Sequence, residues 1–127
     1  ESTGIPFVTA RNANDFCASD HPQFVGRPGT FGQRGANFAV QSCDMYLAIG
    51  TRLGLAQTGY NPKDYARGAT IIMVDVDYHE LNKGTVRVDI PILADAQDFL
   101  RELNRYHLRI DVAPWLVWCK GLQANYE

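Results

Sequence analysis

The sequence predicts an α/β fold with a doubly wound, mainly parallel, Rossmann-like sheet. Two stretches, residues 45–50 and 69–77, are apolar almost throughout and are followed or ended by polar residues. Such runs are typical of parallel strands that helices cover on both faces, because neither face then meets water. The chain between the two stretches is long enough for one crossover, which is right-handed in nearly all proteins. The two strands are therefore expected to run parallel in one βαβ unit.

The segment before these strands contains one predicted strand and one unusual loop. Residues 5–10 form the strand, with Pro6 tolerated near its beginning. Residues 12–19 form at most a turn of helix. Glycine then stands at every third position of residues 26–35, which predicts a loop whose backbone closely approaches either a ligand or another segment of the protein.

Two helices are expected around the first buried strand. Residues 36–42 should form a short helix that turns Phe38 and Ala39 toward the sheet. Residues 53–67 contain several glycines and polar residues, so regular structure is expected only as a short helix around residues 62–66. Proline suits the first position of a helix, and Pro62 stands there.

The segment after the second buried strand alternates between short elements. Residues 78–83 should form a helical turn or two, closed by Gly84 in a left-handed conformation. Residues 86–90 alternate apolar and polar side chains, which predicts a strand with one exposed face, at an edge of the sheet. Asp95 is a suitable N-cap for a helix that runs to about Arg105.

Pro114 begins the last predicted helix. Five of its side chains form one stripe at helical spacing: Trp115, Trp118, Cys119, Leu122 and Tyr126. A stripe of this kind usually packs against another part of the protein. Its partner is expected to be a further domain.

The composition is that of an ordinary globular domain, with 46% hydrophobic residues, 20% charged residues and a net charge of −2. The absence of a basic cluster argues against a nucleic-acid surface. No apolar run approaches the ~18 residues of a membrane-spanning helix. Cys17, Cys43 and Cys119 are too far apart for a zinc site or a disulfide framework, which predicts a cytoplasmic protein with buried or incidental thiols.

Polar side chains at the ends of the two buried strands are candidate ligand contacts. In open α/β sheets, ligands bind beyond the carboxyl ends of the strands, where an acidic residue can accept hydrogen bonds from ribose hydroxyls. Asp75 and Asp77 have this position, although either could instead cap the helix that follows. Arg52 follows the other strand. Its guanidinium could hold a phosphate or form a surface salt bridge.

Several short motifs follow one another in a characteristic order. They are Gly26-Arg27-Pro28-Gly29, Gly32, Ala36-Asn37-Phe38-Ala39-Val40, Cys43-Asp44-Met45-Tyr46-Leu47-Ala48-Ile49-Gly50-Thr51-Arg52, residues 71–77, Glu80, Lys83 and Pro91-Ile92-Leu93-Ala94-Asp95. Over residues 4–103, this order resembles the central domain of thiamine-diphosphate-dependent enzymes of the acetolactate synthase type. Each motif is common alone, so the resemblance depends on their succession.

The resemblance implies a domain related to nicotinamide- and flavin-binding folds, which in some members holds the adenine, ribose and diphosphate of FAD. The residues that it places around this cofactor are Gly32 in the glycine loop, Gly50, Thr51 and Arg52 at the diphosphate and ribityl part, Asp75 and Val76 near the adenosine, and Asp95 at the rim. Other members bind ADP or no nucleotide. This chain also has Phe31-Gly32-Gln33 where many flavin-containing members have His-Gly-Thr.

The resemblance also implies a domain organisation. Residues 1–110 would form the central domain, truncated at its N-terminus and lacking its first strand, and residues 111–127 a linker helix toward a C-terminal domain. In the full-length enzyme, thiamine diphosphate and Mg²⁺ depend on a glutamate of the N-terminal domain and on a Gly-Asp-Gly…Asn motif of the C-terminal domain. Neither motif is found in these residues, so the chain by itself is expected to be inactive.

The function implied is that of a carboligase or decarboxylase acting on 2-oxo acids, with this domain in a structural role or binding FAD or ADP. Its expected partners are the other domains of the same enzyme and further copies, in a dimer or tetramer. One alternative is a stand-alone nucleotide-binding or interaction module without a catalytic role. Another is a nicotinamide-dependent deacylase of the same fold, although its catalytic histidine and paired cysteines are not evident.

Overall fold

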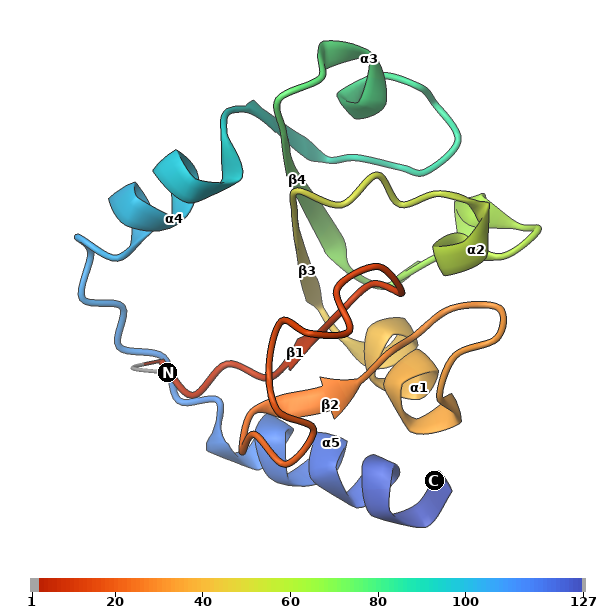
Figure 1. The fold of residues 1–127 in the computed structure, drawn as a ribbon, viewed down its shortest axis with the longest axis vertical. Coiled ribbons are helices and arrows are strands. Elements are labelled where there is room, and N and C mark those ends of the chain that lie inside the picture. The colour runs from red at the N-terminus through yellow and green to blue at the C-terminus, as the bar shows by residue number, and fades with distance from the viewer. Residues whose placement is uncertain (1–2, 127) are drawn as a thin grey trace. The chain divides into compact units, whose positions relative to one another are not determined.

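The computed structural model describes residues 3–126. The chain divides into two compact units, one within Glu1–Val40 and Leu108–Glu127 and the other within Gln41–His107. Each unit contains a small parallel sheet, so the α/β class and the parallel sheet are confirmed (Figure 1). The division into a domain of residues 1–110 and a linker of residues 111–127 stays a prediction. Within residues 3–126, no helix has the length and apolar character to cross a membrane.

The second unit, residues 41–107, contains a three-stranded sheet in the order β3-β4-β5. The strands are β3 (Met45–Ile49), β4 (Thr70–Asp75) and β5 (Ile90–Leu93), and both pairings are parallel. The register of β3 and β4 runs from Met45 opposite Thr70 to Ile49 opposite Val74. The two predicted strands therefore exist, pair directly and end together.

The prediction that both strands are buried on each face is correct only for β4. Met73 and Val74 point to opposite faces of β4, and both are fully buried. In β3, by contrast, the Met45 side chain is 50% exposed, Leu47 is also exposed, and Ala48 is the one buried residue. The physical reason is position, because β4 lies between two strands whereas β3 lies at an edge of this sheet.

Three short helices connect these strands, and a fourth follows β5. They are α2 (Leu55–Thr58), the 3₁₀-helix η1 (Pro62–Asp64), α3 (Tyr78–Leu81) and α4 (Ala96–Leu103). Pro62 occupies an N-terminal position of η1, as predicted, whereas α2 lies in a segment that the sequence predicted to be irregular. Gly84 has the expected left-handed conformation, but α3 already ends at Leu81.

The predicted strand at residues 86–90 is wrong. The strand β5 begins at Ile90 and passes through Pro91, which pairs with Met73. An edge strand tolerates proline, because one side of its backbone makes no bond within the sheet. Val86 is instead buried in the preceding loop. Asp89 makes two hydrogen bonds with the backbone of Ile71. Its Oδ2 accepts the Ile71 N–H at 2.7 Å, and its own backbone N–H donates to the Ile71 carbonyl at 2.9 Å.

The first unit contains β1 (Phe7–Val8), β2 (Phe24–Gly26), the helix α1 (Arg34–Ser42), which ends just beyond it, and α5 (Ala113–Tyr126). The strands β1 and β2 pair in parallel, with Phe7 opposite Phe24 and Val8 opposite Gly26. The predicted strand at residues 5–10 is thus confirmed but shorter. The strand β2 was missed, because its three residues stand between Pro22 and the glycine-rich stretch and show no periodicity. Residues 12–19 form turns and no helix.

A small core joins α1, β2 and α5, and Figure 1 shows α5 alongside β2. Its buried members are Val25, Ala39 and Cys119, and the partly buried Val8, Trp115 and Leu122 pack against them. Ala39 faces this core as predicted. Phe38 does not, because neighbouring helical positions point about 100° apart. Its side chain is 40% exposed, and its ring lies 5.0 Å from that of Tyr126.

The α5 stripe has its packing partner within this unit. Lys120 Nζ donates to the Phe24 carbonyl at 2.8 Å, and a Cβ at Gly35 would lie 2.9 Å from the Leu122 carbonyl oxygen. The rings of Trp115 and Trp118 stack with centroids 4.8 Å apart. The helix predicted from Pro114 onward therefore packs on residues 3–40 of its own chain.

Candidate functional site

Six of the seven predicted cofactor contacts lie at one edge of the β3-β4-β5 sheet. They are Gly50, Thr51 and Arg52 after β3, Asp75 and Val76 at the end of β4, and Asp95 before α4. Because the strands are parallel, their carboxyl ends share this edge, as the sequence predicted. Gly32 belongs to the other unit and is described separately below.

Gly50 joins the end of β3 to its neighbours. Its N–H donates to the Val74 carbonyl at 2.9 Å, so the pairing with β4 continues one residue past the strand. Its φ of +60° lies in the left-handed region, which favours glycine. A Cβ here would also lie 3.3 Å from the Cβ of Ala96, so a side chain would crowd the first residue of α4.

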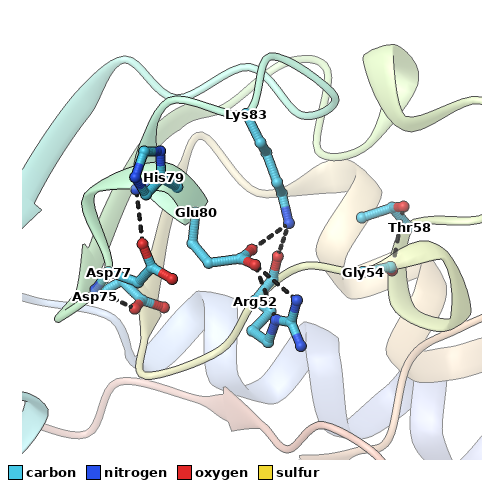
Figure 2. A network of polar contacts seen from close by, with 8 residues as sticks. All are labelled: Arg52, Gly54, Thr58, Asp75, Asp77, His79, Glu80 and Lys83. Carbon is cyan, nitrogen blue, oxygen red and sulfur yellow. Dashed lines mark hydrogen bonds and ion pairs between the residues drawn. The ribbon is translucent and has the colours of Figure 1, made fainter.

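Arg52 is held by an ion pair. Its Nε and Nη2 donate to Glu80 Oε1 at 3.0 and 2.8 Å, while Lys83 donates to Glu80 Oε2 at 2.9 Å (Figure 2). Hydrogen bonds from Lys83 and then Arg52 lower the pKa of Glu80, and those to Glu80 raise the pKa of Arg52. Because the Arg52 side chain is 79% exposed, solvent screens this pair strongly.

The same network braces the backbone after Arg52. Lys83 Nζ also donates to the Arg52 carbonyl, which precedes Leu53. Leu53 is buried and has a φ of +46°, a left-handed conformation that is unfavourable for a branched side chain. The contact with Lys83 therefore stabilises a turn that local preference opposes. The one signal for this in the sequence is the i,i+3 spacing of Glu80 and Lys83, although Lys83 lies beyond the end of α3.

The two aspartates at the end of β4 have different partners. Asp77 caps α3 by accepting the His79 N–H at 2.8 Å, which is one of the two roles the sequence left open. Asp75 accepts the Asp77 N–H through Oδ1 at 2.9 Å, and its side chain is only 9% exposed. Within residues 3–126, Asp75 Oδ2 accepts no hydrogen bond. Because β4 ends at Asp75, strand periodicity does not relate the two side chains.

Asp95 is an N-cap, as predicted. Its Oδ1 accepts the N–H groups of Gln97 at 2.8 Å and Asp98 at 3.1 Å. The backbone joins this cap to β4, because the Ala94 N–H donates to the Asp75 carbonyl at 3.0 Å. The start of α4 is therefore fixed beside the end of β4, and both amides that a bound anion would use are already taken.

Gly32 packs against its own loop in the first unit. A Cβ at Gly32 would lie 2.4 Å from the Arg27 carbonyl oxygen and 2.6 Å from the Gly29 nitrogen. Its N–H donates to the Gly29 carbonyl at 3.0 Å. The sequence left open whether the backbone of this loop approaches a ligand or another segment of the protein. The contacts of Gly32 are with backbone of its own loop, which agrees with the second explanation.

The edge of the β3-β4-β5 sheet can recognise hydroxyl groups better than phosphates. Four carboxylates gather there against two cations: Asp75, Asp77, Glu80 and Asp95 against Arg52 and Lys83. A carboxylate accepts hydrogen bonds from hydroxyls and repels phosphate oxygens. In residues 3–126, no three His, Cys, Asp or Glu side chains form a group that could hold a metal ion.

Comparison with known proteins identifies the family. The family described as thiamine pyrophosphate enzyme, central domain, matches residues 1–103. The chain belongs to this family. The resemblance seen in the order of sequence motifs is thereby confirmed, and the family implies thiamine diphosphate as the cofactor of the enzymes in which this domain occurs.

Individual relatives agree on the kind of enzyme. A probable acetolactate synthase large subunit of Methanocaldococcus jannaschii is 36% identical over 127 residues, covering 100% of this chain. An acetolactate synthase large subunit of Corynebacterium glutamicum is 34% identical over 131 residues, covering 99% of it. The aligned region spans 21% of the length of each relative. This chain therefore corresponds to about a fifth of those subunits.

Proposed function

We propose that this chain is the central domain of a thiamine-diphosphate-dependent carboligase or decarboxylase that acts on 2-oxo acids, as acetolactate synthases do. The observation that carries the proposal is the family match over residues 1–103 together with acetolactate synthase relatives along the whole chain. Other domains of the enzyme would hold thiamine diphosphate and Mg²⁺. Thiamine diphosphate supplies the stabilised carbanion on which carbon–carbon bond formation depends.

The enzyme would work in the cytoplasm as a dimer or tetramer. The central domain would position the catalytic domains through its rigid parallel sheet, in which β4 is buried on both faces. A structural role suits the described residues, since their acids and cations mostly bind one another or the backbone.

A nucleotide, FAD or ADP, would bind at the carboxyl edge of β3 and β4. The residues at this edge suit the adenosine part of such a nucleotide best. Asp75 retains one carboxylate oxygen for ribose hydroxyls, and the exposed Val76 beside it offers an apolar surface to adenine. Gly50 and Thr51 would lie against the ribityl and diphosphate part, where the lack of a side chain at Gly50 leaves the backbone accessible.

The fit is weaker for the diphosphate. Arg52 is its one nearby cation among the predicted contacts, and its Nη1 is not used by Glu80. Asp95 would act indirectly by holding the start of α4 in place. A contact from Gly32 stays an expectation from the family resemblance.

Activity of the full-length enzyme tests the main proposal. With thiamine diphosphate, Mg²⁺ and pyruvate, it is expected to release CO₂ and form acetolactate. Absence of turnover with pyruvate and other 2-oxo acids, in a folded protein that binds thiamine diphosphate, would contradict it. A folded protein that binds neither thiamine diphosphate nor 2-oxo acids would favour the stand-alone module.

Nucleotide binding is tested separately. Flavin absorbance at about 450 nm in the purified enzyme would identify FAD. Otherwise, ADP at about a hundredfold excess over its dissociation constant should stabilise the fold by about 2.7 kcal/mol. The Asp75→Asn variant should weaken this binding, because the amide can still accept the Asp77 N–H but has lost the charge that attracts hydroxyl donors.

Asp77→Asn is the matched control, since it makes the same chemical change at the helix cap two residues away. The two variants should differ in affinity for ADP. Equal affinities in Asp75→Asn, Asp77→Asn and the unmodified enzyme would rule out Asp75 as the ribose contact.

A further inference from the structure

One carboxylate binds both cations at the carboxyl edge of β3 and β4. Glu80 Oε1 accepts hydrogen bonds from Arg52 Nε at 3.0 Å and Arg52 Nη2 at 2.8 Å, and Glu80 Oε2 accepts one from Lys83 Nζ at 2.9 Å. Figure 2 shows this carboxylate between the two basic side chains. Of the guanidinium nitrogens of Arg52, Glu80 therefore leaves only Nη1 for a ligand.

The guanidinium of Arg52 can be reached from solvent. The Arg52 side chain is 79% exposed, whereas the Glu80 side chain that it contacts is 15% exposed. A ligand at this edge can therefore approach Arg52 directly. Competition for donors limits its binding, because an N–H group that bonds a carboxylate must leave it before it can bond a phosphate oxygen.

The surrounding charges also favour the existing ion pair over a phosphate. Glu80 raises the pKa of Arg52 most, through its hydrogen bonds and its charge, and the charges of Asp77 and Asp75 raise it further. Three carboxylates thus act on this edge against the two cations. A diphosphate would enter a region of net negative charge, and like charges disfavour one another.

The nucleoside part of a nucleotide does not meet this competition. Ribose hydroxyls would donate to Asp75 Oδ2, which accepts no hydrogen bond within residues 3–126, while Asp75 Oδ1 keeps the Asp77 N–H at 2.9 Å. Adenosine is uncharged at neutral pH, so its binding does not require Arg52 to leave Glu80. The two parts of a nucleotide therefore depend on different residues of this edge.

We propose that Glu80 determines the ligand preference of this edge by competing with a diphosphate for Arg52 and Lys83. This inference rests on the proposed nucleotide site and names the residue that sets its selectivity. With the Glu80 carboxylate in place, the edge binds the adenosine part and gains little affinity from the diphosphate. Without that negative charge, both cations are available, and the edge prefers ADP to adenosine.

Calorimetric titration of the full-length protein with adenosine and with ADP tests this preference. Bound flavin is removed first, and thiamine diphosphate and Mg²⁺ are kept at saturation, so that ADP cannot occupy a thiamine diphosphate site. The unmodified protein should bind the two ligands with similar affinity. Glu80→Gln should bind ADP about tenfold more tightly, because Arg52 donors are released to a charged acceptor, and its affinity for adenosine should not change.

A double-mutant cycle assigns the gain to Arg52. Arg52→Gln alone should change the affinity for ADP little, since Glu80 already holds this side chain. The combination of Glu80→Gln with Arg52→Gln should lose most of the gain. Glu102→Gln is the matched control for net charge, because it removes the same charge from the exposed ion pair of Glu102 with Arg105. This control should bind ADP as the unmodified protein does.

An unchanged affinity of Glu80→Gln for ADP would overturn the proposal, and so would an equal gain in Glu102→Gln. If Glu80→Gln does not fold, Arg52→Gln decides the question. A loss of ADP affinity of about tenfold in Arg52→Gln would show that Arg52 binds the diphosphate despite Glu80, which contradicts the proposal. An unchanged affinity would support it.

Adenosine separates this inference from the site on which it rests. If adenosine binds and the affinity for ADP does not respond to Glu80→Gln, only the role of Glu80 is wrong. If neither adenosine nor ADP binds the unmodified protein or Glu80→Gln, the proposed nucleotide site is wrong as well.

Discussion

Two turns that follow parallel strands are braced by opposite kinds of chemistry. The loop of residues 26–33, after β2, is held by neutral amides, since Gln33 and Asn37 bond directly to its backbone. The turn of residues 50–54, after β3, is held by charges, since Lys83 bonds its backbone and Glu80 binds both cations. In both places side chains fix the backbone of the turn, but neutral groups do so in one and charged groups in the other.

The difference also decides whether the nearby arginine side chain is paired with a carboxylate. Where neutral amides brace the backbone, Arg27 keeps its charge uncompensated. Where charges brace it, Arg52 is already paired with Glu80.

The largest effect is expected from Gly32→Ala in the amide-braced loop. Its Cβ would meet the Arg27 carbonyl oxygen at 2.4 Å and the Gly29 nitrogen at 2.6 Å, so backbone must move. A loss of about 2–3 kcal/mol in the free energy of unfolding is expected, measured by urea denaturation.

Gly54→Ala is the matched change in the charge-braced turn. Nothing lies within 4 Å of a Cβ there, and its φ of −77° suits alanine. Its stability should stay within about 0.5 kcal/mol of the unmodified protein. Similar losses in the two variants would mean that the loop of residues 26–33 is not tightly packed.

An intermediate effect is expected from Gln33→Met, which removes the acceptor for the Arg27 N–H but keeps a side chain of similar length. The loss should be about 1–2 kcal/mol, because that N–H loses its partner. Added salt should not change it, since no charge is involved. Gln41→Met on the exposed end of α1 is the control, with a change below about 0.5 kcal/mol. If the loss of stability in Gln33→Met depended strongly on salt, the loop of residues 26–33 would not be held by neutral amides, and its contrast with residues 50–54 would fail.

The smallest effect is expected from Glu80→Gln in the charge-braced turn. The variant should be slightly less stable at low ionic strength, and the difference should shrink in about 1 M NaCl, where exposed charges are screened. It should also be pH-dependent. The folded state lowers the pKa of Glu80 below its ordinary value of 4.5, so the carboxylate stabilises the fold at neutral pH.

That contribution should disappear as the pH falls through the lowered pKa of the folded state. The difference between the unmodified protein and Glu80→Gln is therefore expected at about pH 7 and should vanish in acid, once the pH is below that lowered pKa. Chemical denaturation at both pH values measures it. A difference that persists in acid would show that Glu80 acts through packing and not through its charge.

Local features of the sequence predicted much of the fold. The strands β3 and β4 followed from their apolar runs, the cap at Asp95 from its residue type, and α5 from Pro114 and its stripe. Where the local signal was weak, prediction was wrong. β5 was placed before Pro91, because proline usually marks a strand boundary, and the three-residue β2 was missed.

The sequence by itself thus determined the α/β class, the parallel strands and the edge at which their polar residues gather. Only the tertiary structure decided which of those side chains are paired with other residues of the chain. Glu80 meets Arg52 across 28 positions of sequence, whereas Lys120 reaches the Phe24 carbonyl across 96 positions. Helix caps and apolar runs depend on residues a few positions apart and can be recognised locally. Charge pairing depends on distances that exist only once the chain has folded.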